Sequence, residues 1–148
     1  MKKLNNKGFS LVELIIVIAI MAVLIAVLAP QFLRYVEKSR LQRDNSAISE
    51  IANAAKVAMA NETINATIAN SASAACGTIA GKVYSFAGAA GTTLDGEVGA
   101  VVGTTVTLSS NTYATAPTIT VAKDANGMVT VSATIIPDVG VAGVLTNF

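Results

Sequence analysis

Apolar and charged positions are distributed unevenly along the chain, and its first third contains a long apolar run. Residues 14–29 are all apolar, and no ionisable residue stands between Glu13 and Arg34. With a rise of about 1.5 Å per residue, a helix over residues 9–33 would be about 37 Å long, which is enough to cross a hydrocarbon core of about 30 Å. The pattern therefore predicts one membrane-spanning helix over residues 9–33.

The helical pattern continues after this run, but only one side of the helix stays apolar. Leu41, Ile48 and Ala55 recur every seven residues, whereas charged residues occupy the other sides. A single apolar stripe has to be covered, and the sheet of a globular domain is its natural partner. Because Asn61 begins a stretch of poor helix formers, we expect this amphipathic half of the helix to cover residues 34–61.

Short alternating runs in the second half of the chain predict β-strands. The clearest are residues 118–123 and 128–135, which flank the turn-rich tetrapeptide Asp124-Ala125-Asn126-Gly127. Alternation on both sides of such a turn predicts a β-hairpin. Residues 83–87 and 100–108 predict two further strands.

These patterns together predict an α+β fold. We expect a long N-terminal helix whose apolar half protrudes and whose amphipathic half packs on a small antiparallel sheet of three or four strands. The last long strand should end at Pro137, with residues 138–148 as a tail or an edge strand. The expected order along the chain is a basic segment over residues 1–8, the apolar helix over 9–33, its amphipathic half over 34–61, a linker over 62–81 and a β-rich head over 82–148.

The composition argues against an enzyme and against a nucleic-acid partner. Charged residues make up 13% of the chain, compared with about 25% in an average soluble domain, and the net charge is only +1. The sequence has no histidine, the most frequent general base and a common metal ligand, and a single cysteine, Cys76, cannot form an internal disulfide. We therefore predict no catalytic residues, no cofactor and no metal site, with Cys76 as a small buried side chain.

Two motifs resemble ligand-binding loops but lack essential parts. Asp124, Asn126 and Gly127 match the start of a calcium-binding loop, yet the later carboxylate ligands are missing, so we predict a plain turn. The glycine-rich stretch 88–103, which contains Asp95-Gly96-Glu97, lacks the Gly-Lys-Ser/Thr of a phosphate-binding loop. For this stretch we predict a solvated loop.

The charges that flank the apolar run indicate its orientation in a membrane. Residues 1–8 carry three lysines and no acid, so the positive-inside rule places them in the cytoplasm. Basic residues also cluster between Arg34 and Arg43, which reduces the charge difference across the membrane. A secretory signal cut near Ala29 is an alternative, but the apolar run continues past that residue into the amphipathic helix.

Two residues of the apolar helix are unusual. Glu13 is an acid at the start of the run, and a carboxylate costs about 2.5 to 3.5 kcal/mol at the centre of a membrane helix and less near its end. It is either a functional group or a marker of the interface, where a negative charge also suits the first turn of a helix. Pro30 removes one intrahelical hydrogen bond, so it either kinks or loosens the helix or marks its membrane terminus.

The start of the apolar run contains the block Lys7-Gly8-Phe9-Ser10-Leu11-Val12-Glu13-Leu14, and Pro30 follows the run. These features resemble the N-terminus of bacterial type IV pilins and pseudopilins, and the resemblance covers residues 1–43. It implies that a prepilin peptidase cuts between Gly8 and Phe9 on the cytoplasmic side and that the new Phe9 amine is methylated. It also implies a curved or partly melted helix at Pro30.

The resemblance further implies that subunits leave the membrane and join a helical filament whose core is a bundle of apolar helices. Glu13 follows Phe9 by one helical turn, so its carboxylate can lie near its own amine or near that of an incoming neighbour. We therefore expect Phe9 and Glu13 to direct assembly.

The expected protein is the structural subunit of a type IV pilus (fimbrium), an extracellular appendage of the kind used in adhesion and motility. Its partners would be further copies of itself, a prepilin peptidase and the pilus assembly machinery. The precursor would be a single-pass protein of the inner membrane, with its N-terminus in the cytoplasm. The alternatives are a pseudopilin of a type II secretion or DNA-uptake machine and a monomeric membrane-tethered binding domain.

Overall fold

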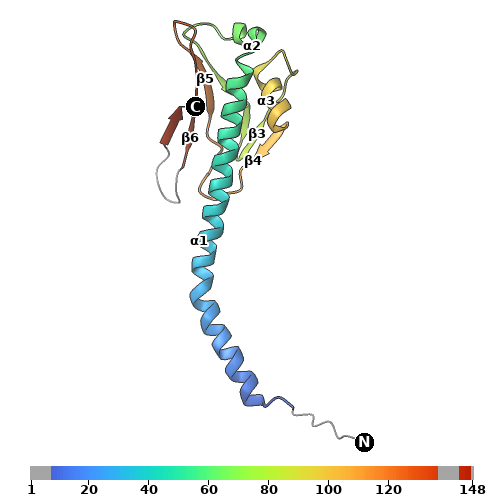
Figure 1. Ribbon diagram of the computed structural model, residues 1–148, viewed down its shortest axis with the longest axis vertical. Coiled ribbons are helices and arrows are strands. Elements are labelled where there is room, and N and C mark those ends of the chain that lie inside the picture. The colour runs from blue at the N-terminus through green and yellow to red at the C-terminus, as the bar shows by residue number, and fades with distance from the viewer. Residues whose placement is uncertain (1–7, 137–143, 148) are drawn as a thin grey trace, which may run out of the picture. The chain divides into compact units, whose positions relative to one another are not determined.

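The structure of the chain is a computed structural model that describes residues 8–136 and 144–147 (Figure 1). It divides into two compact units, residues 1–36 and 37–148, and helix α1 contributes to both. The helices are α1 (Leu11–Ala58), α2 (Glu62–Thr67) and α3 (Leu94–Val102). The strands are β1 (Ser73–Cys76), β2 (Thr78–Ala80), β3 (Val83–Ser85), β4 (Thr105–Thr107), β5 (Ile119–Lys123), β6 (Val129–Ile135) and β7 (Val144–Asn147).

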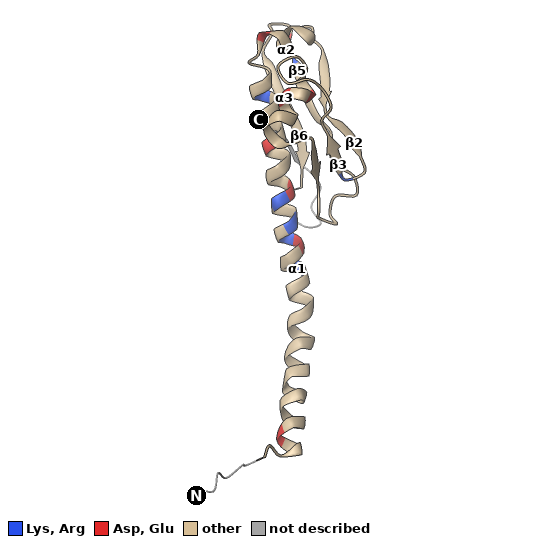
Figure 2. Ribbon diagram, turned by 90° about the vertical axis from the view of Figure 1, so that its right-hand side faces the viewer, with Lys and Arg blue, Asp and Glu red and all other residues tan. Residues whose placement is uncertain are grey.

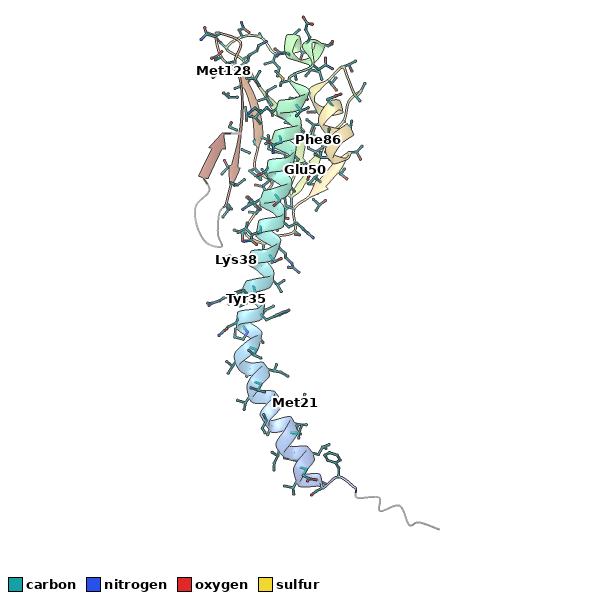
Figure 3. All side chains as sticks on the ribbon, in the orientation of Figure 1. Met21, Tyr35, Lys38, Glu50, Phe86 and Met128 are labelled. Carbon is teal, nitrogen blue, oxygen red and sulfur yellow. The ribbon has the colours of Figure 1, made fainter. Side chains whose placement is uncertain are left out.

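In the first unit, α1 carries its apolar side chains on the surface. Every large apolar residue from Phe9 to Leu33 is at least half exposed, from 50% for Ile15 to 85% for Phe9. One window of α1, with a mean hydropathy of 3.2, is long and apolar enough to cross a membrane. The predicted apolar helix is therefore present, and Figure 3 shows its side chains, among them Met21, pointing away from the ribbon.

In the second unit, α1 buries one of its sides. The heptad positions Leu41, Ile48 and Ala55 are each at most 1% exposed, which confirms the predicted stripe. The buried positions extend from Ala52 on one edge to Ala54 on the other, which is about 160° of the circumference at about 100° per residue. A stripe this wide leaves room for two covering layers.

Two antiparallel sheets provide these layers. One sheet has the order β1-β5-β6-β7 and the other the order β2-β3-β4. Figure 1 shows β5 and β6 on one side of α1, and β3, β4 and α3 on the other. The predicted hairpin is confirmed as β5 and β6, whose register pairs the fully buried Val121 and Val131. The α+β fold is therefore confirmed, and its strands form two sheets where one was expected.

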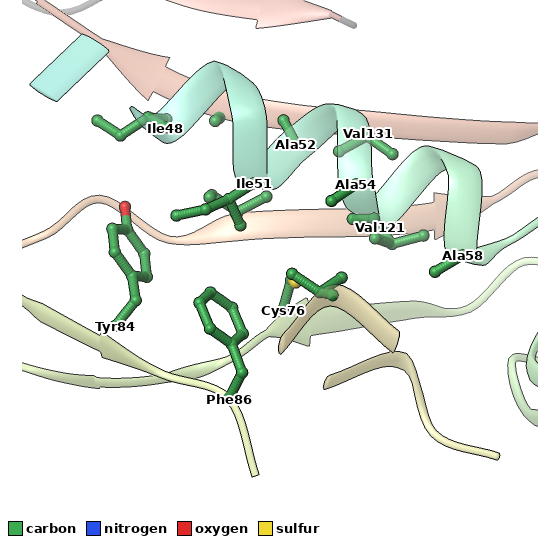
Figure 4. Packing of buried hydrophobic residues seen from close by; sticks show 14 of the residues in the cluster. Ile48, Ile51, Ala52, Ala54, Ala58, Cys76, Tyr84, Phe86, Val121 and Val131 are labelled. Atoms are coloured by element: carbon green, nitrogen blue, oxygen red, sulfur yellow. The ribbon is translucent and has the colours of Figure 1, made fainter. Parts of the chain in front are cut away.

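The core lies where the two sheets meet α1 (Figure 4). Val121 of the first sheet and Tyr84 of the second belong to one cluster with Ile51 of α1. The rings of Tyr84 and Phe86 are stacked, with their centres 6.3 Å apart and their planes at 8°. The Tyr84 hydroxyl donates to the Pro117 carbonyl, so the polar end of this buried side chain is satisfied.

Residues 62–81, expected to be a linker, contain α2, β1 and β2. Helix α1 ends at Ala58 instead of near Asn61, and the Asn61 side chain accepts the backbone N–H of Thr63 and caps α2. The Ser and Ala side chains of β1 give little hydrophobic contrast, although Cys76 at its end is fully buried. Ordered elements therefore replace the expected linker.

Residues 88–103, predicted as a solvated loop, contain α3. The Thr93 hydroxyl accepts the backbone N–H of Gly96 at 3.1 Å and so caps the helix. A Cβ placed on Gly96 would lie 2.4 Å from the Ala89 carbonyl group, so this buried glycine permits close packing. The strand predicted over 100–108 is shortened to β4. The sequence did not predict this helix because the stretch is rich in glycine, which is a poor helix former.

Some expectations concern residues outside the described part of the chain. Residues 1–7, which contain the three N-terminal lysines, are among them, and so is Pro137. The orientation inferred from the lysines and the strand end at Pro137 therefore stay predictions. Strand β7 pairs antiparallel with β6, which agrees with an edge strand near the C-terminus.

Candidate functional site

The start of α1 brings together the residues expected to direct assembly. The Ser10 carbonyl accepts the Leu14 backbone N–H at 3.2 Å, so Ser10 is the residue that caps the helix. The Ser10 backbone N–H donates to Glu13 Oε2 at 2.9 Å. This Ser-x-x-Glu spacing is that of a capping box, in which the acid satisfies an N-terminal donor of the helix. The spacing is visible in the sequence and could have predicted the bond.

Gly8 and Phe9 precede the helix. Both are exposed outside the regular helix, and no atom lies within 4 Å of a Cβ placed on Gly8. The peptide bond between them is therefore accessible. Phe9 and Glu13 lie within one turn of each other in sequence, whereas Pro30 lies seventeen residues, or about 25 Å, further along α1 than Glu13.

Glu13 keeps acceptor capacity beyond its capping bond. A carboxylate can accept hydrogen bonds on both of its oxygens. Within the described part of the chain, Oε2 is bonded to Ser10 and Oε1 has no partner. The negative charge also lies at the positive end of the helix dipole, which stabilises it. The site can therefore bind an additional cationic group such as an amine.

The helix that follows offers a large apolar surface. Ala19, Ile20, Val23 and Leu24 lie side by side on this surface, which is open to its surroundings. Helix α1 continues without interruption through Pro30. Because proline has no N–H, the carbonyl four residues before it loses its usual intrahelical partner, so the helix is weakened there without being broken.

Two acids of α1 in the second unit hold the loop that follows β4. Asp44 is 1% exposed and accepts the backbone N–H groups of Ser109 and Ser110. Glu37 accepts the Ser110 hydroxyl and the Thr112 backbone N–H. The Ser110 hydroxyl bond holds the pKa of Glu37 below its usual value, although desolvation acts in the opposite direction. Both acids therefore hold the loop against α1 by hydrogen bonds, a structural role that the sequence analysis did not predict.

The buried Cys76 is not an activated nucleophile. It is fully buried, and burial, with a smaller contribution from the charge of Asp95, raises the pKa of its thiol to about 12. The thiol is therefore protonated at neutral pH. Burial likewise raises the pKa of Tyr84. Among the described residues, no group of three or more His, Cys, Asp or Glu side chains could hold a metal ion.

The remaining motifs have local structural roles. Asp124 Oδ1 accepts the backbone N–H groups of Asn126 and Met128, as in a plain turn. Asn65, which stands in a glycosylation sequon, donates its amide to the Met59 carbonyl and accepts the Lys123 ammonium group. A glycan on Asn65 would take one of the two hydrogens of the amide nitrogen that donates to Met59.

Comparison with known protein families agrees with the geometry at the start of α1. The family model of the prokaryotic N-terminal methylation motif matches residues 3–29, which include Gly8, Phe9 and Glu13. No curated protein and no solved structure shows significant similarity to the chain. The motif is the signature of a prepilin-processed N-terminus and points to a structural subunit instead of an enzyme. The chain thus has the N-terminus of a precursor of the type IV pilin-like or pseudopilin class.

Proposed function

We propose that the chain is the structural subunit of a type IV pilus and polymerises through the apolar part of α1 into an extracellular filament. The proposal depends above all on the apolar surface of residues 9–33, which the described residues leave exposed. Burial of one large aliphatic side chain is worth about 1.5 to 3 kcal/mol relative to water, so this surface needs another cover. Lipid covers it in the precursor, and further copies cover it in the filament.

Processing would change the charge at the start of the helix. Removal of residues 1–8 takes away three lysines and changes the formal side-chain charge from +1 to −2. It leaves an amine on Phe9, which stays cationic after methylation. The exposed bond between Gly8 and Phe9 lies outside the helix, and this supports its role as the cleavage site of a prepilin peptidase.

Glu13 would set the register of assembly. Its Oε2 caps α1, and its Oε1 can accept the Phe9 amine of a neighbouring copy. At a separation of about 4 Å and an effective dielectric constant of about 20, this attraction is about 4 kcal/mol before the desolvation of both charges is subtracted. Because lipid already covers the apolar surface, polar pairing and close packing decide how the helices stack.

Pro30 would let α1 adjust during assembly. The helix is continuous at this residue, yet it has one backbone hydrogen bond fewer than an ordinary helix. Local bending or stretching therefore costs less there than elsewhere in the apolar segment. This property suits a helix that moves from a membrane into a filament.

The proposal is tested on the sheared surface fraction of cells that express the chain. Mass spectrometry should find a mature subunit that begins with methylated Phe9, and electron microscopy should find filaments made mainly of this chain. Glu13→Leu should abolish the filaments while the precursor still inserts into the membrane. Glu62→Leu, which alters an exposed acid of α2, should leave them unchanged. A mature terminus near Pro30 would refute the proposal.

A pseudopilin carries the same N-terminal motif and is the second candidate. It becomes the better interpretation when processing occurs at Gly8 and no filament with this chain as main component forms outside the cell. A monomeric membrane-tethered binding domain is distinguished by Glu13→Leu, because a simple tether would retain its function without the acid.

A further inference from the structure

One side of α1 in the second unit carries polar side chains that neither sheet covers. We call it the open face, and it consists of the exposed residues Ser39, Arg43, Ser46, Glu50 and Asn53. Their spacings of four, three, four and three residues place them within about 80° of the helix circumference. Glu50, labelled in Figure 3, lies on the side of α1 that is visible there.

Positive and negative charges are separated along this face. Figure 2 shows most of the Lys and Arg residues of α1 in one stretch, and Lys56 lies apart from them in the last turn of the helix. The acids of that stretch, Glu37 and Asp44, accept hydrogen bonds from the loop after β4, and Glu37 also lies 4.0 Å from Arg40. Four basic and two acidic residues give residues 34–44 a formal net charge of +2. Arg43 donates to the Ser109 hydroxyl and keeps further N–H donors. Glu50 follows Arg43 by seven residues, or about 10.5 Å, and has no partner within the described residues.

We propose that the open faces of successive copies turn toward a common axis, displaced by seven residues, so that Glu50 of one copy pairs with Arg43 of the next. This inference rests on the proposed filament, because copies inserted in one membrane orientation have parallel helices. Without a displacement, Arg43 of one copy would face Arg43 of the next, and Glu50 would face Glu50, so that both pairs would repel. A displacement of about 10.5 Å replaces both repulsions with one attraction.

Two further properties of the face suit this contact. Ser39 and Ser46 are small, so a neighbouring helix can approach closely enough for the longer Arg43 and Glu50 side chains to meet. The contact is also heterologous, because it joins Glu50 of one copy to Arg43 of another. Each pair of copies therefore leaves one Arg43 and one Glu50 unpaired, and these can bind further copies. Such contacts continue in an open helix, whereas a two-fold dimer would satisfy itself and stop.

Charge reversal tests the pair in filaments of the full-length chain. Arg43→Glu and Glu50→Arg should each lower the yield of sheared filaments at least about tenfold, because each opposes like charges. The double variant should restore the yield to within about threefold of wild type, and so should coexpression of the two single variants. Lys56→Glu is the matched control, since this exposed residue lies on α1 outside the open face, and its yield should stay near wild type.

The outcomes separate this inference from the proposed function. Filaments that tolerate Glu50→Arg, or that neither the double variant nor coexpression restores, would overturn the Arg43–Glu50 pair and leave the pilus proposal intact. A wild-type chain that is processed but never forms filaments would overturn the pilus proposal instead. Immunoblots of the membrane fraction compare precursor levels. The Glu50→Arg result stands without the Arg43 variant, because the Glu50 side chain makes no hydrogen bond or ion pair within the described residues.

Discussion

The carboxylate of Asp44, which is 1% exposed, accepts a hydrogen bond of 2.6 Å from the backbone N–H of Ser110, 66 residues further along the chain. The neighbouring Ser109 N–H adds a second bond of 2.9 Å to the same oxygen. A buried carboxylate is tolerated when several donors replace its lost hydration. This contact therefore fixes the loop after β4 on the side of α1.

Replacing Asp44 with Ala should destabilise the second unit strongly. The change leaves two backbone N–H groups without acceptors, and we expect the free energy of unfolding to fall by about 3 kcal/mol. Denaturant unfolding of the full chain in detergent micelles, followed by the near-ultraviolet circular dichroism of its tyrosines, measures this loss. Asn53→Ala, at an exposed position of the same helix, should change the stability by less than about 0.5 kcal/mol. Equal effects of the two variants would contradict the role of Asp44.

Glu37 predicts a dependence of stability on pH. The Ser110 hydroxyl bond lowers its pKa in the folded chain from the usual 4.5, so Glu37 stabilises the fold fully above that value. The contribution should be lost as the pH falls through the lower pKa of the folded state, because the folded chain takes up the proton less readily than the unfolded chain. Unfolding curves of wild type and Glu37→Gln between about pH 7 and about pH 3 measure it. The two curves should converge at the acidic end, and a gap that is constant with pH would argue against the assignment.

Elements with a strong period were predictable from the sequence. The buried positions Leu41, Ile48 and Ala55 follow from a seven-residue repeat, and the hairpin of β5 and β6 follows from alternation around a turn. The block from Gly8 to Glu13 was likewise readable, because its specificity lies in a local order of residues. Local signals of this kind do not depend on how distant segments pack.

The elements that were missed depend on tertiary contacts. The hydrogen bonds from the loop after β4 to Asp44 join residues that are 65 and 66 positions apart in the sequence, and no local sequence pattern predicts them. The second sheet covers part of a buried stripe on α1 that is too wide for one sheet. Ala52 and Ala54 mark the two edges of this stripe, and the sequence alone does not indicate that both are buried. The open face could not be predicted from the sequence either, because no local pattern shows which sides of α1 the two sheets cover or that the Glu37 carboxylate is bonded to Ser110.

Gly96 of α3 provides a test of close packing. Alanine is the better helix former by about 1 kcal/mol, so propensity alone favours Gly96→Ala. A Cβ at this position would lie 2.4 Å from the Ala89 carbonyl group, and we expect a net loss of about 2 kcal/mol in the free energy of unfolding. Thermal unfolding of the full chain in detergent detects this loss as a lower Tm. Val101→Ala, at an exposed position of the same helix, should leave the Tm nearly unchanged, and a Tm raised by Gly96→Ala would show that the contact yields.

The bond between Ser10 and Glu13 predicts how firmly α1 begins. Ser10→Pro removes the N–H that Glu13 accepts, at a position before the first helical residue, Leu11, where a missing N–H does not interrupt the helix. The first turn should lose about 1 kcal/mol, and amide exchange of residues 11–14 in micelles should become about fivefold faster by nuclear magnetic resonance. Ser10→Ala keeps the N–H, and because the Ser10 hydroxyl makes no hydrogen bond within the described residues, this variant should exchange more slowly than Ser10→Pro. Equal rates for the proline variant and wild type would mean that Glu13 does not cap the helix, and its carboxylate would then enter assembly with neither oxygen held in place.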